Sequence, residues 1–226
     1  MKKSLFASGF VITLSLSTLS VVAQTQSRVD ILKQIEAKRA ELAALEKQFL
    51  APSDEDRAAY ADFLRKPDTG LIRLLPRETY DSDTFKNNNR QKAITIRGGA
   101  AYYSFARLTH EYGYGSDIEL SQGFLTSGFT GGQRASLIDL GDIPLESVTL
   151  ENGAVQDLVR FDANDRKPSQ ARLPLKYSTY AVRSIDYSSS DVLVAFKVVR
   201  IDTDGSAIIL WKMLQRGPVP ETLRIR

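Results

Sequence analysis

Side-chain chemistry near neutral pH in this chain would centre on one short stretch, LTHEYGYGSD at residues 108–117. This stretch contains His110, the sole histidine of the sequence, with Glu111 beside it and Asp117 close behind, while cysteine is absent from the chain. Imidazole is the side chain that normally changes its charge between about pH 5 and 8. His110, Glu111 and Asp117 are therefore the candidate catalytic residues.

The patterns that common mechanisms require are missing around His110. An H-E-x-x-H zinc motif needs a second histidine, and the sequence has Gly113 and Tyr114 after the glutamate instead. No G-x-S-x-G elbow or S-x-x-K motif occurs either. We therefore predict a non-catalytic protein with neither metal nor cofactor. The alternative is a secreted hydrolase of extracellular or envelope polymer that uses carboxylates near this Tyr/Gly-rich loop.

Tyrosines are concentrated in and just before the same stretch. Residues 101–112 have the composition of one strand, which would place Tyr102 and His110 on one face and Tyr103 on the other. Aromatic rings that carry a hydroxyl suit contact with a protein or glycan partner. The predicted ligand-binding residues are Tyr102, Tyr103, Tyr112 and Tyr114. The competing interpretation is that these tyrosines are structural residues at the rim of the core.

The clearest secondary-structure signal is the helical segment RVDILKQIEAKRAELAALEKQFL at 28–50. Its apolar residues have a heptad-like spacing that Lys38 interrupts. The seam consists of Ile31, Ile35, Leu42, Leu45 and Phe49. Because about three heptads are marginal as an isolated helix, this seam needs a packing partner. A second helix that begins after Ser53 could form an αα-hairpin with it; docking on the rest of the chain and a homo-oligomer are the alternatives.

Short apolar segments separated by turn residues follow from residue 68 onward and indicate β-structure. The predicted strands are 71–75, 93–97, 101–109, 117–120, 135–140, 148–150, 178–185, 191–199 and 207–214, with a short helix at 154–161. Asp204-Gly205 predicts a tight hairpin turn between the last two strands. The acidic segments 162–165 and 202–206 are interpreted as turns and not as calcium loops. The predicted fold class is α+β, mainly β: an N-terminal helix or helical hairpin followed by an antiparallel β-sandwich or barrel-like domain.

The first residues have the basic, apolar and small-residue order of a secretory signal peptide. We predict a signal peptide at 1–23, a helical appendage at 24–66 and a β-rich domain at 67–226. The signal predicts a bacterial protein of the periplasm or the cell exterior, with an unknown protein or glycan partner in the envelope. No later segment is long and apolar enough to predict a membrane span.

Charge argues against nucleic acid as the partner. The sequence has 30 Lys and Arg against 27 Asp and Glu, and removal of residues 1–23 would take away Lys2 and Lys3 and leave 28 against 27. Such a balance lacks the basic excess that phosphate binding requires. Because the chain has no cysteine, its stability must come from an apolar core and not from disulfides.

Overall fold

The computed structural model describes residues 28–80, 100–110, 115–128, 133–161, 171–187 and 189–219. The chain divides into two compact units, Met1–Ala43 and Ala44–Arg226. Several predictions lie outside the described residues: the signal peptide, the strand at 93–97, the turn at 162–165, and the candidates Glu111, Tyr112 and Tyr114.

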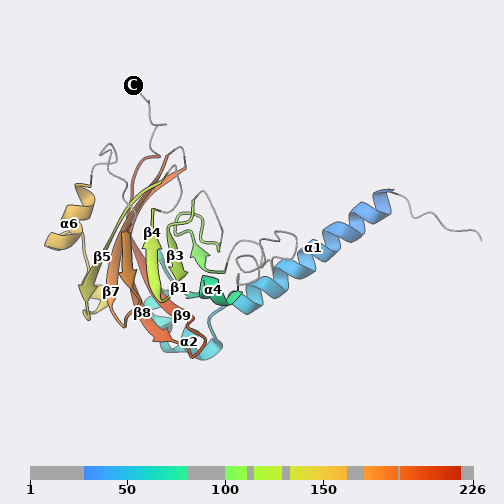
Figure 1. Ribbon diagram of the computed structural model, residues 1–226, viewed down its shortest axis with the longest axis horizontal. Helices are drawn as coiled ribbons and strands as arrows, with labels where there is room; N and C mark the ends of the chain where they lie inside the picture. Colours follow the sequence, from blue (N-terminus) through green and yellow to red (C-terminus); the bar gives the residue numbers. More distant parts are fainter. Residues whose placement is uncertain are drawn as a thin grey trace, which may run out of the picture. The chain divides into compact units, whose positions relative to one another are not determined.

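Two antiparallel sheets form the second unit (Figure 1). The larger sheet has the strand order β1 (Thr69–Leu74), β9 (Ala207–Arg216), β8 (Ser190–Ile201), β7 (Thr179–Asp186) and β5 (Gln133–Gly141). The smaller sheet has the order β2 (Tyr102–Tyr103), β3 (Ile118–Ser121), β4 (Phe124–Ser127) and β6 (Ala171–Pro174). The sheets are not closed on each other among the described residues, so the architecture is a sandwich and the predicted fold class is confirmed.

One apolar core fills the space between the sheets. Alternate residues of β8 point into it, and Val194, Phe196 and Val198 of that strand are fully buried there. Ile118 and Leu125 contribute to the same core from the smaller sheet. Because side chains alternate along a strand, the residues between these positions face the other side of the larger sheet. The predicted strand at 191–199 is therefore buried on both faces, with one set of alternate residues in each of two apolar clusters.

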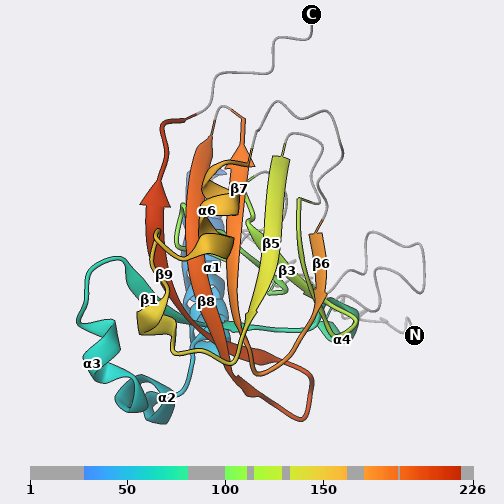
Figure 2. The same ribbon diagram turned by 90° about the vertical axis from the view of Figure 1, so that its left-hand side faces the viewer.

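Short helices cover the outer face of the larger sheet (Figure 2). They are α3 (Ala61–Leu64), the 3₁₀ helix η2 (Leu145–Ser147) and α6 (Gly153–Val159). Phe63 of α3 and Leu158 of α6 pack with Leu193 and Ala195 of β8 in a second cluster. The αα-hairpin prediction is therefore wrong, since the apolar face that would cover the seam of the first helix packs on the sheet instead.

The segment after Pro52 forms two very short helices, α2 (Asp54–Ala59) and α3. Ser53 caps α2: its Oγ accepts from the Asp56 backbone N–H at 3.1 Å, and the Asp56 carboxylate accepts from the Ser53 N–H at 3.1 Å. This reciprocal arrangement satisfies backbone donors that a helix start leaves free. The predicted start of a helix after Ser53 is therefore confirmed. A short helix α4 (Arg77–Tyr80) follows β1.

The predicted strand at 101–109 is wrong, because the chain reverses within it. Only the residues of β2 pair with β3, and Ser104 then forms an isolated bridge with Thr109. The Ser104 N–H donates to the Thr109 carbonyl at 2.9 Å, and Leu108 between them takes a left-handed φ of 57°. Tyr102 and His110 consequently do not share a face of one strand.

Other strand predictions were corrected at the edges of the sandwich. The predicted strand at 148–150 is irregular and follows η2. Conversely, β4 and β6 fall outside every predicted strand. Pro174 in β6 explains part of this failure, because proline weakens a strand signal and is tolerated at a sheet edge, where β6 lies. The helix predicted at 154–161 is confirmed as α6.

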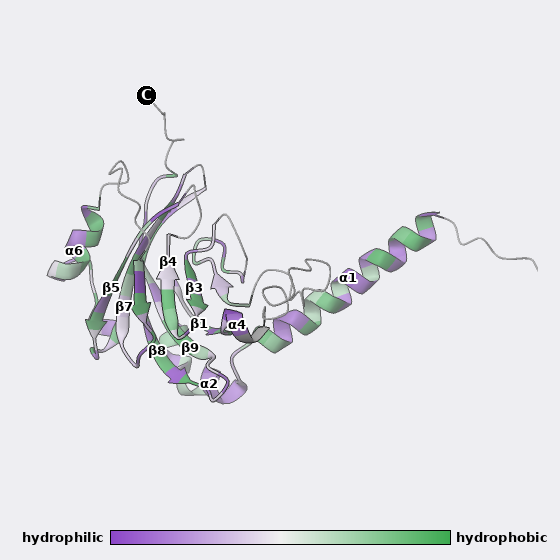
Figure 3. Ribbon diagram, in the orientation of Figure 1, coloured by the Kyte–Doolittle hydropathy of each residue, from purple (hydrophilic) through white to green (hydrophobic). Residues whose placement is uncertain are grey.

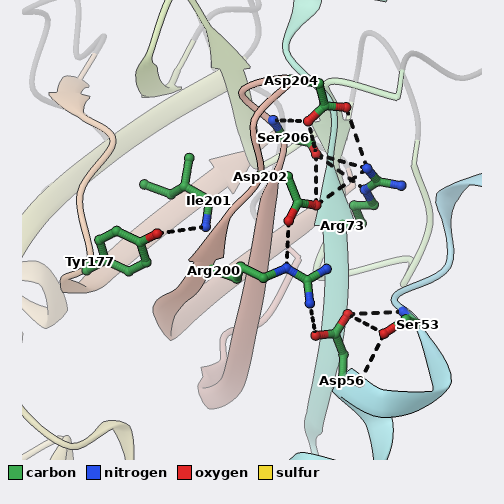
Figure 4. A network of polar contacts seen from close by, with 9 residues as sticks. All are labelled: Ser53, Asp56, Arg73, Tyr177, Arg200, Ile201, Asp202, Asp204 and Ser206. Atoms are coloured by element: carbon green, nitrogen blue, oxygen red, sulfur yellow. Dashed lines mark hydrogen bonds and ion pairs between the residues drawn. The ribbon is translucent and has the colours of Figure 1, made fainter.

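The turn between β8 and β9 is tied to the N-terminal part of the second unit by a polar network (Figure 4). Gly205 has a φ of 82°, as the Asp-Gly signal predicted. Arg73 of β1 approaches both Asp202 and Asp204, while Arg200 pairs with Asp202 at 2.6 Å and with Asp56 of α2. The carboxylates of this turn therefore meet arginines, which supports its interpretation as a turn.

Candidate functional site

His110 is held in a structural role at the end of its turn. Its Nε2 lies 2.7 Å from the carbonyl oxygen of Arg73. Because a carbonyl can only accept, Nε2 must carry the proton and donate it. The ring also lies edge-on to Tyr103, with centroids 5.2 Å apart, and burial lowers the His110 pKa. The imidazole is thus neutral and hydrogen-bonded near pH 7.

Asp117 anchors the turn that precedes His110. Its Oδ2 accepts from the Phe105 backbone N–H at 2.6 Å, and its own N–H donates to the Tyr103 carbonyl at 2.8 Å. The side chain is fully buried, and this desolvation raises the pKa of Asp117 to about 6. Among the described residues, no hydrogen bond or ion pair joins Asp117 to His110, so the structure does not bring the two together as an acid–base pair.

The two predicted binding tyrosines that the structure describes are core residues. Tyr102 is 1% exposed and Tyr103 is 5% exposed. Tyr103 packs edge-on against Phe105, with ring centroids 5.2 Å apart. Their burial favours the competing interpretation that they are structural, since a ligand could reach neither ring without displacing its neighbours. Ligand binding by the tyrosines stays a prediction.

The first helix, α1 (Arg28–Leu50), carries the candidate functional surface. We name its seam the α1 seam: Ile31, Ile35, Leu42, Leu45 and Phe49. These side chains are 40–57% exposed. Figure 3 shows apolar and polar residues interleaved along the helix. Exposure of one isolated apolar residue is ordinary, but a regularly spaced series on one helix is typical of an interaction surface.

Charged residues accompany the α1 seam. In heptad notation, Ile35, Leu42 and Phe49 take position a, and Ile31, Lys38 and Leu45 take position d. Lys38 extends its Nζ to within 2.6 Å of the Glu41 carboxylate, one turn further along at position g. The lysine thus introduces a charge into an otherwise apolar series, together with its own counter-ion. Such a residue can specify how helices align.

Sequence reasoning missed a set of inward-facing polar residues in the sandwich, at the ends of β5, β7 and β8. Gln133, Ser184, Asp186 and Ser190 are buried there. Ser184 and Asp186 alternate with apolar residues in and just after a predicted strand, so a polar inward face at its end was a readable signal. Which strands lie next to β7 was not readable, because that depends on pairing between distant segments.

Comparison with known proteins yields no match: no protein-family model, curated protein or solved structure is detectably similar to this chain. A function must therefore be inferred from the residues themselves. None of the helices in the described ranges is long and apolar enough to cross a membrane.

Proposed function

We propose that this is an exported, non-catalytic bacterial protein of the periplasm or cell exterior, which assembles through the α1 seam with a second copy of itself. The observation that carries the proposal is the exposure of the whole seam on a 23-residue helix. Burying one Leu or Ile side chain is worth about 1.5–3 kcal/mol, so pairing of two such seams would offset the cost of association.

The position of Lys38 selects a second copy in antiparallel orientation. In a parallel pair equivalent residues meet, so two Lys38 side chains would share one buried layer and Glu41 would face Glu46 of the second copy. In an antiparallel pair position a faces position d. If the two helices cross with their Ala40 residues opposite each other, each Lys38 lies beside Leu42 of the other copy. The two Glu41 carboxylates are then close enough to neutralise both ammonium groups.

The antiparallel alignment also pairs the remaining seam residues without gaps. Ile35 faces Leu45 of the second copy, and Ile31 faces Phe49. One two-fold axis thus produces all three pairs of facing seam residues, as expected for an isologous interface. The hydrolase alternative lacks comparable support, because Asp117 already holds backbone N–H groups and His110 already donates to Arg73.

Leu42→Asp should convert a dimer of residues 24–226 to a monomer. Glu41 already pairs with Lys38, so each new carboxylate adds an excess negative charge to the layer, and the substitution also removes apolar contact. We expect the dissociation constant to rise at least ~100-fold, by the loss of about 3 kcal/mol. Multi-angle light scattering over a concentration series measures this. Val29→Asp is the matched control, since Val29 is 59% exposed on the same helix but lies off the seam.

A wild-type chain that is monomeric at 100 µM, or a dimer that survives Leu42→Asp, would contradict self-assembly through the α1 seam. Melting of the β-sandwich provides a second readout. It should be unchanged in Leu42→Asp, because Leu42 belongs to neither apolar cluster of the sandwich. A monomer whose melting temperature falls with this substitution would instead indicate that the seam docks on its own chain.

Orientation can be tested by cysteine pairing, since the chain has no cysteine of its own. We expect Ile35→Cys and Leu45→Cys to form a mixed disulfide-linked dimer when the two variants are combined under mild oxidation. Neither variant should cross-link efficiently when it is alone. Non-reducing electrophoresis with a tag of different size on each variant distinguishes the products. Efficient self-linkage of each single variant would show a parallel pair and refute the antiparallel model.

A further inference from the structure

A row of buried polar side chains crosses three neighbouring strands of the larger sheet. Gln133 of β5 pairs with Asp186 of β7, which in turn pairs with Ser190 of β8. Each of the three is at least nine-tenths buried. Directly opposite residues on one face have Cβ atoms about 4.5–5.5 Å apart. The row therefore gathers an amide, a carboxylate and a hydroxyl within a small volume.

The amide of Gln133 has a defined orientation. Its Nε2 donates to the Ser116 carbonyl and to Ser184 Oγ, both at 2.7 Å. Since the Ser116 carbonyl cannot donate, the nitrogen must be on that side, and the Gln133 oxygen must point away from it. That oxygen, Oε1, is buried and receives no hydrogen bond from the described residues. An unsatisfied buried acceptor of this kind is costly.

Asp117 reaches the same cluster from the residue before β3. Its carboxylate interacts with Ser184, the hydroxyl that Gln133 also contacts, and it lies close enough to Asp186 for their charges to interact. One oxygen, Oδ2, is used by the backbone N–H groups of Phe105 and Ala106. The other, Oδ1, is buried and receives no hydrogen bond within the described ranges.

Four buried oxygens of this cluster thus have no hydrogen-bond partner among the described residues. They are Asp117 Oδ1, Gln133 Oε1, Asp186 Oδ2 and Ser190 Oγ. The positive charge that acts on Asp186 is Arg107, whose Nη2 donates to Ser189 Oγ at 3.1 Å. One guanidinium offsets only one of the two carboxylates. Acceptor oxygens that outnumber donors, with an excess negative charge, are the surroundings that a cation requires.

We propose that Asp117, Gln133, Asp186 and Ser190 form a calcium site that braces one end of the sandwich. Carboxylate, amide and hydroxyl oxygens are hard ligands, and Ca²⁺ accepts six to eight of them in irregular geometry, whereas Mg²⁺ demands a near-ideal octahedron. No described group of three or more His, Asp or Glu residues could hold a metal. The site instead combines two carboxylates, Asp117 just before β3 of the smaller sheet and Asp186 of the larger, with an amide and a hydroxyl oxygen from the larger sheet.

Thermal unfolding of residues 24–226 tests the calcium site. At pH 7.5, after treatment with EDTA and dialysis, addition of Ca²⁺ should raise the melting temperature by about 3–6 °C at a concentration tenfold above its dissociation constant. Mg²⁺ at the same concentration should have at most a small effect. Terbium luminescence gives a direct measure of binding, since Tb³⁺ emits on transfer from nearby aromatic side chains and Ca²⁺ should displace it.

Matched carboxamide variants locate the ion. Asp117→Asn and Asp186→Asn keep the side-chain shape and should each weaken Tb³⁺ binding at least ~10-fold, while circular dichroism confirms that they fold. Asp157→Asn, in an exposed pair on α6, should leave binding unchanged. If 10 mM Ca²⁺ changed neither the melting temperature nor the Tb³⁺ signal, the proposal would be overturned. Protonation would then be what neutralises the buried carboxylates. Retention of binding by Asp117→Asn would also overturn the proposal. The Leu42→Asp monomer should bind Ca²⁺ as the wild type does, so this test is independent of self-assembly.

Discussion

Phe196→Ala should lower the free energy of unfolding by about 3–5 kcal/mol, the range for truncation of a buried phenylalanine. Phe196 is fully buried on β8, the middle strand of the larger sheet. Its ring stacks on Tyr180 with centroids 5.3 Å apart and lies 6.1 Å from Phe105. Removing it would leave a cavity beside the rings of Tyr180 and Phe105, and the lost contacts add to the lost burial.

Urea unfolding monitored by circular dichroism measures the effect of Phe196→Ala, and the single tryptophan supplies a local probe. Trp211 lies in the same core, with its ring 5.5 Å from that of Phe105. Its emission should shift to longer wavelength if the core loosens. Val159→Ala on α6 is the control, since Val159 is 38% exposed and should change stability by less than ~1 kcal/mol. A loss below 1 kcal/mol for Phe196→Ala would contradict the packing described here.

Asp117 should make the calcium-free protein less stable as the pH rises from about 4 to 7. Burial raises its folded-state pKa to about 6 from an ordinary value of 3.8. The folded state therefore binds the proton more tightly than the unfolded state. Its contribution is fully present below pH 3.8 and is lost as the pH rises through about 6. The difference of about two pKa values corresponds to about 3 kcal/mol.

Comparison with Asp117→Asn isolates this effect from other titrating groups. Asparagine keeps an oxygen for the Phe105 N–H and offers an N–H₂ that can donate to the unsatisfied oxygens. In EDTA, the variant should therefore equal the wild type near pH 4 and exceed it by up to ~3 kcal/mol at pH 7.5. Asp186 has a raised pKa from burial, which acts in the same direction and is opposed by Arg107, but it is common to both proteins. Parallel stability curves from pH 4 to 7.5 would contradict a buried Asp117.

The features predicted correctly from sequence depend on short-range physics. The alternation of apolar residues in β8 fixed which side chains point to each face, and Asp204-Gly205 supplied the positive φ of the turn. Ser53 and Asp56 form their cap within four residues. The heptad spacing of the α1 seam is likewise a property of one helix. In each case the information is contained in neighbouring residues.

The failures depend on contacts between distant residues. The segment 101–109 has the composition of a strand, but the Asp117 carboxylate holds the backbone of Phe105 and Ala106 in a turn. Tyr60 and Phe63 have the spacing of a hairpin partner, yet both pack with residues of the larger sheet instead. The Gln133, Asp186 and Ser190 row follows from strand order and register, which pair residues up to 53 positions apart (186 minus 133).

The pairing of β1 with β9 has a consequence for the order of folding events. In the described sheet, β1 (Thr69–Leu74) pairs only with β9 (Ala207–Arg216). The first strand therefore cannot join the sheet until the last strand is present. Contacts of such long sequence separation give a high contact order, and they require closure of a long loop before they contribute any stability. The Arg73 contacts with Asp202 and Asp204 form only at that late step. A nascent chain in which β9 has not yet been synthesised is consequently unable to complete the larger sheet.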